Sequence, residues 1–466
     1  MPSVTVSAPG KVLLAGGYLV LESPNVGLVV AANKRFYCTI EGSDDKDSRN
    51  DSTIVVHSPQ FHSEWEYRLS YAANEDGTVE VGLHPSPENS SSNGFIEKTI
   101  RLTMAYIIGS VSTGGSAAIP STIKVTIRAD NDFYSLIPHL KERGLDRTPE
   151  NVESLPRFLP CPQDEEGKPI VNKTGLGSSA ALVTSCVGAL LEFFGLRVGP
   201  RALNLAQISH CHAQGKVGSG FDVSAAVHGS HIYRRFPKCT LPDVLHQLQN
   251  GGEMVSSNAV QLLKTLVESD WDGGVVSPLQ IPHGLQLLLA DVCGGSESPS
   301  MARKVLSWKT SREAPDEQPF WENLAEINPR IIDRLQVDIS VEECATTTAA
   351  EWQGSHPLLF QLHEALVESR SSLKAMGEAA GVPIEPDEQS RLANATQKLP
   401  GVVVALVPGA GGYDAMACLH VDQDSVRENI GKVWSTWEDN GASVCPLSVR
   451  AAAYGEGLRV EPDFQP

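Results

Sequence analysis

The stretch Lys173-Thr174-Gly175-Leu176-Gly177-Ser178-Ser179-Ala180-Ala181 places two glycines and several small residues directly before a long uncharged segment. Residues 178–194 are predicted to form a buried helix, with Ser178 as its N-cap and Gly195 as the left-handed residue that ends it. Glycines let a ligand approach the backbone, and the free N–H groups and dipole at a helix N-terminus favour an anion. The stretch therefore indicates a phosphate-binding loop, although a tight turn that binds nothing would use the same residues.

Other phosphate-binding motifs are missing from the sequence. A Walker A loop requires Gly-Lys followed by Ser or Thr, but every Gly-Lys pair here is followed by Val or Pro. The protein-kinase signatures H-R-D and D-F-G are also absent. Gly175-x-Gly177-x-x-Ala180 satisfies a relaxed dinucleotide pattern, but residues 169–173 before it make a poor buried strand. The sequence thus excludes a P-loop enzyme and a protein kinase, and it disfavours a nicotinamide site.

Three further segments contain candidate functional residues. Residues 7–18 hold Lys11 alone in an otherwise uncharged stretch, and an unpaired charge must find an anion or reach solvent. Residues 214–225 place Asp222 between a glycine run and small apolar residues, and residues 408–414 form a glycine loop. Each segment also has a plainer interpretation: a solvated turn for Lys11, a helix cap for Asp222, and a common turn for the glycine loop.

The composition narrows the possible partners and location. The 466 residues include 37 basic and 56 acidic side chains, a formal charge of −19 that repels nucleic acids and anionic lipid surfaces. Nine spread cysteines without a C-x-x-C pair fit reduced thiols, and the first residues lack the features of a secretory signal. No apolar run reaches the ~20 residues of a membrane span. We expect a cytoplasmic protein with small-molecule partners and neither a nucleic-acid nor a membrane partner.

The predicted elements mix strands and helices in both halves, so the fold class is α+β or α/β, with a domain boundary between residues 230 and 280. Residues 41–53, 86–94, 109–121 and 147–168 are predicted connections because they are rich in polar residues, Gly or Pro. Short apolar runs separated by Gly and Pro predict strands joined by tight turns at 4–7, 11–15, 19–21, 28–32 and 36–40. Further strands are predicted at 123–127, 285–292 and 402–407, and further helices at 95–108, 201–214, 300–308, 357–376 and 424–439.

Four motifs, taken in their order along the chain, resemble those of the GHMP kinases. They are Pro9-Gly10-Lys11, the Gly-Leu-Gly-Ser-Ser-Ala-Ala stretch, Gly218-x-Gly220-x-Asp222 and Gly409-Ala410-Gly411-Gly412. This superfamily comprises galactokinase, homoserine kinase, mevalonate kinase and phosphomevalonate kinase. Within it, residues 15–21, 95–98, 214–222 and 291–297 resemble the eukaryotic, fungal-type phosphomevalonate kinases. The similar motifs run from residue 8 to about residue 415, which is most of the chain.

The resemblance implies an α+β fold of two domains with the active site between them. A ribosomal protein S5 domain 2-like domain, residues 1–240, would cradle ATP, and a ferredoxin-like domain, residues 241–466, would face the acceptor. The implied reaction converts ATP and (R)-5-phosphomevalonate to ADP and (R)-5-diphosphomevalonate, in the mevalonate pathway to isoprenoids and sterols. Two alternatives stay open: a mevalonate kinase-like enzyme with an alcohol acceptor, and a non-catalytic ATP-dependent sensor.

The resemblance also implies roles for individual residues. Lys11 and Asp222 correspond to the catalytic lysine and aspartate of the family, residues 173–181 to the ATP-binding loop, and Ser178 or Ser179 to a ligand of Mg²⁺. Several relatives carry a further Mg²⁺-binding glutamate on the helix before the aspartate, but residues 205–214 contain no acid, so waters and ATP oxygens are expected to complete the metal shell. His210 and His212 should point to different faces of this helix and are not expected to bind a metal together. Candidate acceptor contacts are Tyr18, Lys98, Lys216, Ser219, Ser296, Ser298, Arg303 and Gly411.

The chemistry of the implied reaction favours electrostatics over base catalysis. A phosphate monoester with a second pKa near 6 is mostly ionised at pH 7, so the acceptor needs no strong general base. Two unit charges 4 Å apart repel by roughly 4 kcal/mol at an effective dielectric constant of 20, and several such pairs meet here. Positioning and positive charge should therefore dominate. We expect Lys11 to bridge the donor and acceptor phosphates, and Asp222 to hold Lys11 and accept any residual proton.

Overall fold

Two long antiparallel strands, β1 (Ser3–Ala15) and β2 (Val26–Ser43), pair near one edge of the larger sheet. The computed structural model describes residues 3–44, 52–75, 77–89, 91–111, 119–196, 199–292, 298–311, 319–413, 415–439 and 442–465. The strands predicted at 4–7 and 11–15 are one strand, as are those at 28–32 and 36–40. Pro9-Gly10, which predicted a turn, marks a register shift within the β1–β2 ladder instead.

The larger sheet has eleven strands, in the order β16-β1-β2-β6-β3-β4-β5-β8, with β7 and β15 also paired to β2 and β9 paired to β7. Its pairs are antiparallel except for β3 with β6. The predicted strand 123–127 is confirmed within β6. The remaining strands are β3 (Ser52–Ser58), β4 (Ser63–Ala73), β5 (Val79–Pro85), β6 (Thr122–Ala129), β7 (His231–Arg234), β8 (Met254–Val255), β9 (Gly274–Pro278), β15 (Ala451–Ala452) and β16 (Arg459–Val460).

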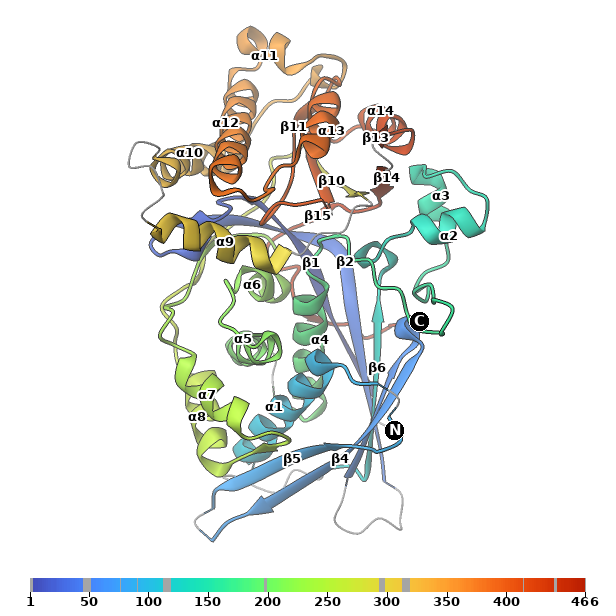
Figure 1. Ribbon diagram of the computed structural model, residues 1–466, viewed down its shortest axis with the longest axis vertical. Coiled ribbons are helices and arrows are strands. Elements are labelled where there is room, and N and C mark those ends of the chain that lie inside the picture. The colour runs from blue at the N-terminus through green and yellow to red at the C-terminus, as the bar shows by residue number, and fades with distance from the viewer. Residues whose placement is uncertain are drawn as a thin grey trace.

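Helices cover one face of this sheet in the lower part of Figure 1, with α4 in the middle of the layer. Nearly every residue of α4 up to Leu191 is buried, which explains why this part of the helix carries no charged residue. The predicted helices 95–108, 178–194 and 201–214 are confirmed as α1, α4 and α5. This layer consists of α1 (Gly94–Val111), α4 (Ser178–Phe193), α5 (Pro200–Gln214), α6 (Phe221–His228), α7 (Pro242–Asn250) and α8 (Ser257–Glu268).

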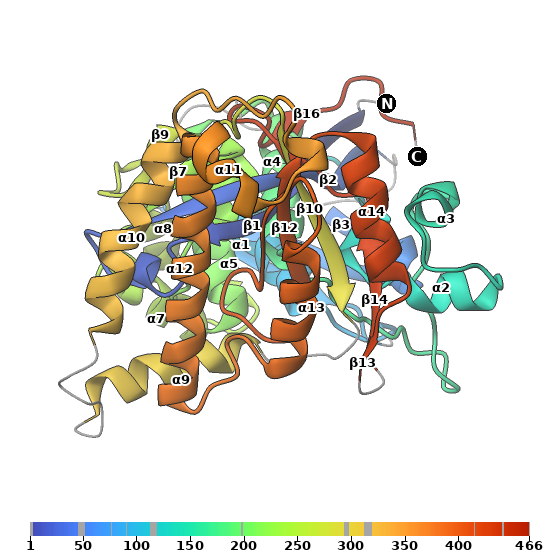
Figure 2. The same ribbon diagram turned by 90° about the horizontal axis from the view of Figure 1, so that it is seen from above.

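The smaller sheet has the order β11-β12-β10-β14-β13, and helices of the C-terminal half lie over it in Figure 2. The predicted strands 285–292 and 402–407 and helices 300–308 and 357–376 are confirmed. The strands are β10 (Leu285–Val292), β11 (Val402–Leu406), β12 (Ala415–Val421), β13 (Glu438–Asp439) and β14 (Ala442–Leu447). The helices are α9 (Ser298–Thr310), α10 (Phe320–Leu335), α11 (Ala349–Ser355), α12 (Pro357–Ala380), α13 (Asp387–Gln397) and α14 (Asp424–Ser435).

The α+β class is confirmed, while the domain boundary at residues 240 and 241 stays a prediction. Strands β8 and β9 lie beyond that boundary and still belong to the larger sheet, so the sheets themselves change between Pro278 and Leu285. After β14 the chain returns to the larger sheet through β15 and β16. Within the described residues, no helix has both the length and the apolar character needed to cross a membrane.

Several predicted boundaries are wrong for local reasons. Residues 19–21 form a 3-10 helix, Leu19–Leu21, instead of a strand. The predicted loop 147–168 contains the short helix α3 (Pro149–Ser154), whose N-cap Thr148 accepts a hydrogen bond from the Asn151 N–H. The helix predicted over 424–439 ends at Ser435, because Glu438–Asp439 pairs with β14. Of the polar connections, Glu41–Ser43 continues β2 and Gly109–Val111 continues α1, while most of residues 44–51 and 112–118 lie outside the described ranges.

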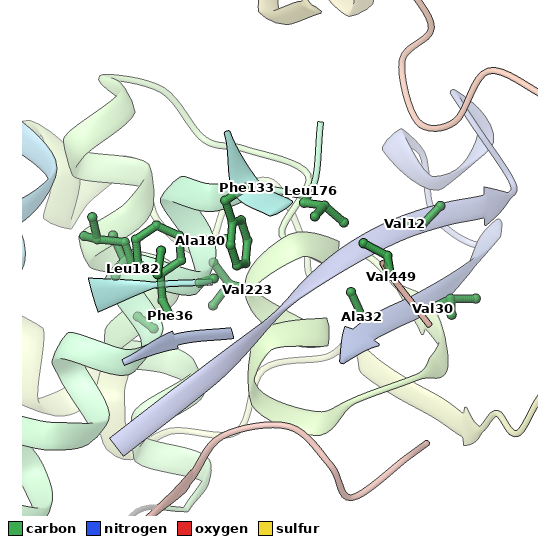
Figure 3. Close-up of a cluster of buried hydrophobic side chains, with 14 of the residues drawn as sticks. Val12, Val30, Ala32, Phe36, Phe133, Leu176, Ala180, Leu182, Val223 and Val449 are labelled. Carbon is green, nitrogen blue, oxygen red and sulfur yellow. The ribbon is translucent and has the colours of Figure 1, made fainter. Parts of the chain in front are cut away.

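The hydrophobic core fixes the backbone on both sides of the sheet–helix interface. One buried cluster, part of which Figure 3 shows, contains five residues that are each at most 2% exposed: Val12, Leu176, Phe133, Ala180 and Val223. Three of these residues are sequence neighbours of predicted site residues: Val12 follows Lys11, Leu176 lies in the glycine loop, and Val223 follows Asp222. Packing of these neighbours therefore anchors the segments that hold the candidate site.

A buried ion pair supports the C-terminal glycine loop. Arg370 of α12 donates two hydrogen bonds to Glu385, at 2.8 Å from Nε to Oε2 and 2.7 Å from Nη2 to Oε1, and both side chains are under 10% exposed. The next residue back, Ile384, accepts a hydrogen bond from the backbone N–H of Gly412 at 3.0 Å. The ion pair thus holds the segment on which the loop after β11 rests.

We predict that Glu385→Gln destabilises the protein by about 3–5 kcal/mol, because it leaves the Arg370 guanidinium buried without a counter-charge. The matched control is Glu368→Gln, which breaks the Arg330–Glu368 pair, also 2.7 Å long but about half exposed. That control substitution should lower the free energy of unfolding by only about 0–1 kcal/mol. Urea unfolding of both variants measures the difference, and equal losses would contradict the role given to the buried pair.

Candidate active site

A cavity of about 860 Å³ lies where the two sheets meet. Its walls come from β1 and the turn after it, the loop before α4, the loop into α6, the end of β10, α9 and the loop after β11. This size is within the range typical of small-molecule sites. The predicted site residues that line it are Lys11, Tyr18, Lys173, Gly175, Leu176, Gly177, Ser178, Ser179, Lys216, Ser219, Asp222 and Gly411.

Lys11 lies along the glycine loop. Its Nζ donates to the Gly175 carbonyl at 3.0 Å, and its backbone N–H donates to the Leu176 carbonyl at 2.9 Å. A Cβ on Gly177 would lie only 2.9 Å from Cε of Lys11. Gly10 permits the same close approach, since a Cβ there would lie 2.9 Å from the Leu176 oxygen. The structure therefore brings Lys11 and the glycine loop together.

The electrostatic setting of Lys11 is unusual for a lysine. Burial lowers the pKa of its ammonium group, and the Asp222 carboxylate opposes this shift. No hydrogen bond or ion pair joins these two described side chains, so Asp222 acts on Lys11 through space rather than by contact. Lys173 and Lys216 also line the cavity and add positive charge to this wall.

The N-terminus of α4 opens into the same cavity. Gly177 is the N-cap, in the left-handed conformation with φ 76°, and no side chain caps the helix. The predicted capping by Ser178 is therefore wrong, because Ser178 is the first residue of the helix and Gly177 is its N-cap. The uncapped N–H groups of the first turn and the helix dipole suit an anion.

Three predicted residues of the ATP-binding loop do not line the cavity. Thr174 is fully buried and donates from Oγ1 to the Asp132 carbonyl at 2.5 Å. Ala180 and Ala181 are fully buried in the core. These residues hold the loop and the helix in place, while Gly175 to Ser179 face the cavity.

Asp222 is the second residue of α6, after Phe221. The residue before the helix, Gly220, is its N-cap and has the left-handed conformation. Its Oδ1 accepts from the backbone N–H of Val223 at 3.0 Å, and its Oδ2 lies 3.9 Å from His210 Nε2. The side chain is 20% exposed, so the carboxylate stays accessible from the cavity that it lines.

The predicted acceptor contacts divide into two groups. Tyr18 lines the cavity and donates from its hydroxyl to the Ala410 carbonyl at 2.8 Å, which connects β1 to the glycine loop after β11. Lys98 instead donates to the His212 carbonyl at 3.5 Å, and Arg303 is exposed on α9; neither lines the cavity. Ser296 lies outside the described residues, as does the side chain of Ser298 in α9.

The structure adds residues that sequence reasoning missed. Asp291 at the end of β10 is 3% exposed, lines the cavity, and accepts from Ser135 Oγ at 2.5 Å. Ser135 follows a 3-10 helix, and no sequence pattern pointed to it. Asp291 lies in the stretch 291–297 that resembles the family, but the resemblance assigns this residue no role. The sequence relates His210 only to His212, whereas its Nε2 lies 3.1 Å from Ser179 Oγ.

The fold and this cavity, with its glycine loop opening a buried helix, define a small-molecule kinase of the GHMP class. The family described as "GHMP kinases N terminal domain" matches residues 166–230, which span the loop, α4, α5 and Asp222. Among solved structures, the Streptococcus pneumoniae phosphomevalonate kinase in complex with phosphomevalonate and AMPPNP has the same fold, with a TM-score of 0.58 at 18% identity, over 97% of this chain and 100% of that chain.

Curated relatives assign the family more narrowly. Phosphomevalonate kinase erg8 of Aspergillus fumigatus is 32% identical over 504 residues, covering 99% of this chain and 97% of the relative. The peroxisomal phosphomevalonate kinase of Arabidopsis thaliana is 33% identical over 504 residues, covering 97% and 95%. The chain belongs to the phosphomevalonate kinase family.

We predict that acylation of the Lys11 amine begins at lower pH than the ordinary lysine pKa of 10.5 allows, because burial lowers its pKa and only the neutral amine reacts. In Asp222→Asn the midpoint should fall further, since the carboxylate that raises the pKa is gone. Peptide mass spectrometry across a pH series measures the midpoint. Asp243→Asn, on the exposed surface of α7, is the control and should leave it unchanged. An upward shift in Asp222→Asn would contradict the coupling.

Proposed function

We propose that this chain transfers the γ-phosphoryl group of ATP to the phosphate of 5-phosphomevalonate, giving ADP and 5-diphosphomevalonate. The observation that carries the proposal is the meeting of Lys11, the N-terminus of α4 and Asp222 at one cavity. Membership of the phosphomevalonate kinase family supports the choice of acceptor.

The donor triphosphate would lie on the loop from Gly175 to Ser179. The uncapped N–H groups of α4 and the helix dipole provide fixed positive charge there, without any reorganisation when the phosphates arrive. Gly177 lets the backbone approach the ligand, and Lys11 is already held beside it by the Gly175 carbonyl.

Lys11 would bridge the donor and acceptor phosphates, whose charges repel by roughly 4 kcal/mol per pair at 4 Å and a dielectric constant of 20. Burial lowers the pKa of the Lys11 ammonium group, and a bound polyanion would oppose this shift. Asp222 would keep Lys11 charged through space and accept a residual proton. Lys173 and Lys216 would add positive charge along the same wall.

The site also fits Mg²⁺, which usually takes only one or two protein ligands and completes its shell with water and phosphate oxygens. Within the described ranges, no group of three or more His, Cys, Asp and Glu side chains could form a dedicated metal cage. Ser179 Oγ and the Asp222 carboxylate are hard oxygen donors at the cavity. Ser179 is the better of the two predicted serines, because Ser178 is buried at 8% exposed whereas Ser179 is only half-buried. The ion would neutralise charge on the donor phosphates.

The acceptor would enter from the side of Tyr18, Ser219, Lys216 and Gly411, which line the cavity. Lys98 and Arg303 do not line the cavity and would have to move to reach the acceptor. The partners would be these two small molecules. A cytoplasmic location stays a prediction: the eight cysteines in the described part of the chain are free thiols, as a reducing compartment allows, whereas the Arabidopsis relative is named peroxisomal.

We predict that the protein releases ADP with 5-phosphomevalonate as acceptor and much less with mevalonate. Lys11→Met should lower kcat by roughly 10²–10³-fold, the cost of losing one preorganised electrostatic partner. Asp222→Asn should lose less than the about 10²-fold expected for a missing general base, because the acceptor is already ionised. A coupled ADP assay on both acceptors measures this. If Asp222→Asn lost more kcat than Lys11→Met and the protein preferred mevalonate, the result would identify an alcohol kinase. If neither acceptor were turned over, the result would identify a sensor.

We predict that Gly177→Ala lowers kcat/KM for ATP by about 10²-fold, because the new methyl group displaces Lys11 by a fraction of an ångström or more. Gly195→Ala is the matched control. It lies just beyond the other end of α4 with φ 73°, so it bears the same backbone strain, but no atom lies within 4 Å of its added Cβ. Steady-state kinetics that show equal losses for the two variants would contradict the contact between Lys11 and the loop.

A further inference from the structure

His210 lies in the interior of α5, directly behind the glycine loop. The His210 side chain is only 2% exposed. Its Nε2 atom lies 3.1 Å from the Oγ atom of Ser179. The amide nitrogen of Gln214, one turn further along α5, is 2.9 Å from Nε2 and 3.1 Å from Nδ1. The Phe95 ring packs at 5.9 Å between centroids. The contact with Ser179 is made by Nε2 alone, so this nitrogen faces the first turn of α4.

No hydrogen bond joins the described side chains of His210 and Asp222. Burial lowers the pKa of the imidazole, and Lys216 and Lys173 lower it further, against the opposing charge of Asp222. The 3.9 Å from Nε2 to Asp222 Oδ2 is longer than a hydrogen bond. The hydrogen-bonding partners of Nε2 are therefore the Ser179 hydroxyl and the Gln214 amide.

We propose that His210 is a positioning residue that holds the Ser179 hydroxyl in the orientation needed to receive the donor nucleotide. This inference rests on the proposed function, since Ser179 lines the cavity at the loop assigned to the triphosphate. A serine side chain has three staggered χ1 wells, and its hydroxyl rotates freely unless a partner selects one arrangement. A hydrogen bond made before binding removes that freedom in advance, which improves affinity for the nucleotide.

The position of Asp222 fits the same role. Its Oδ2 faces the nitrogen that contacts Ser179, so one ring edge borders both the donor loop and the start of α6. His210 would thus set the relative placement of two segments that are more than forty residues apart in sequence. It touches neither reacting group itself, so its effect should run through Ser179.

His212 provides a matched control on the same helix. It is also 2% exposed, but its Nε2 contacts Arg101 Nη2 at 3.2 Å, on a different face of α5 from the cavity. A substitution at either position removes a buried imidazole from the same helix. Only the substitution at His210 removes a partner of the loop.

The experiment compares His210→Asn and His210→Gln with the same two changes at His212. Gln can place its amide nitrogen near the position of Nε2, whereas Asn is too short to reach Ser179. We expect His210→Asn to weaken ADP binding, measured by calorimetry, by about 10- to 100-fold, the usual effect of losing a supporting partner behind a site. His210→Gln should recover most of the affinity, and the His212 variants should change it less than about three-fold, in the range of substitutions away from such a site. The KM for ATP should rise with the Kd for ADP while the KM for 5-phosphomevalonate stays constant.

A double-mutant cycle tests whether the effect runs through Ser179. Ser179→Ala should weaken ADP binding by a similar factor, and the Ser179→Ala/His210→Asn protein should be no weaker than either single variant. The inference would be overturned by additive losses in the double variant, or by equal effects of the substitutions at positions 210 and 212. It would also be overturned if Ser179→Ala left the affinity for ADP unchanged, and this result can be obtained even if His210→Asn fails to fold. A wild-type protein that binds ADP but does not phosphorylate 5-phosphomevalonate would overturn the proposed function and leave the role of His210 testable.

Discussion

The placement of one partly buried ammonium group, that of Lys11, against a glycine loop is the constraint on which the rest of the site depends. A lysine that loses water must gain compensation, and here the Gly175 carbonyl and the through-space charge of Asp222 provide it. The contact is possible only because Gly10 and Gly177 leave no side chain between the two segments. The resulting wall is positive before any ligand arrives, in a chain whose formal charge is −19. A polyanionic ligand would therefore find fixed charge at one place on an otherwise repelling molecule.

The fold explains how segments hundreds of residues apart meet at this wall. The β1–β2 pair carries Lys11 to the edge of the larger sheet, and buried neighbours such as Val12, Leu176 and Val223 hold the three key segments in the core (Figure 3). The smaller sheet closes the cavity through Asp291 and through the glycine loop after β11. The Tyr18 hydroxyl donates a hydrogen bond to the Ala410 carbonyl of that loop. That loop rests on the segment fixed by the Arg370–Glu385 pair. Each part of the site is thus supported by packing or by a buried polar contact, as a preorganised site requires.

The sequence predicted most helices and the buried strands of the smaller sheet, because their apolar patterns are long. It divided β1 and β2 wrongly, since Pro9-Gly10 reads as a turn although the ladder continues past it with a register shift. Four motifs located the loop, Lys11, Asp222 and the late glycines, because each combines glycine with a single charged or small polar side chain. His210 and Ser135 could not be found in this way. Their roles depend on contacts across elements, from α5 to α4 and from residue 135 to β10, which local sequence does not encode.

The most direct test of this account is a crystal structure of the protein with a non-hydrolysable ATP analogue and 5-phosphomevalonate bound together. The account predicts the triphosphate on the backbone of Gly175 to Ser179, the acceptor phosphate on the opposite side of the same cavity, and the Lys11 ammonium between the two. A nucleotide bound elsewhere, or a Lys11 side chain turned away from both phosphates, would contradict it.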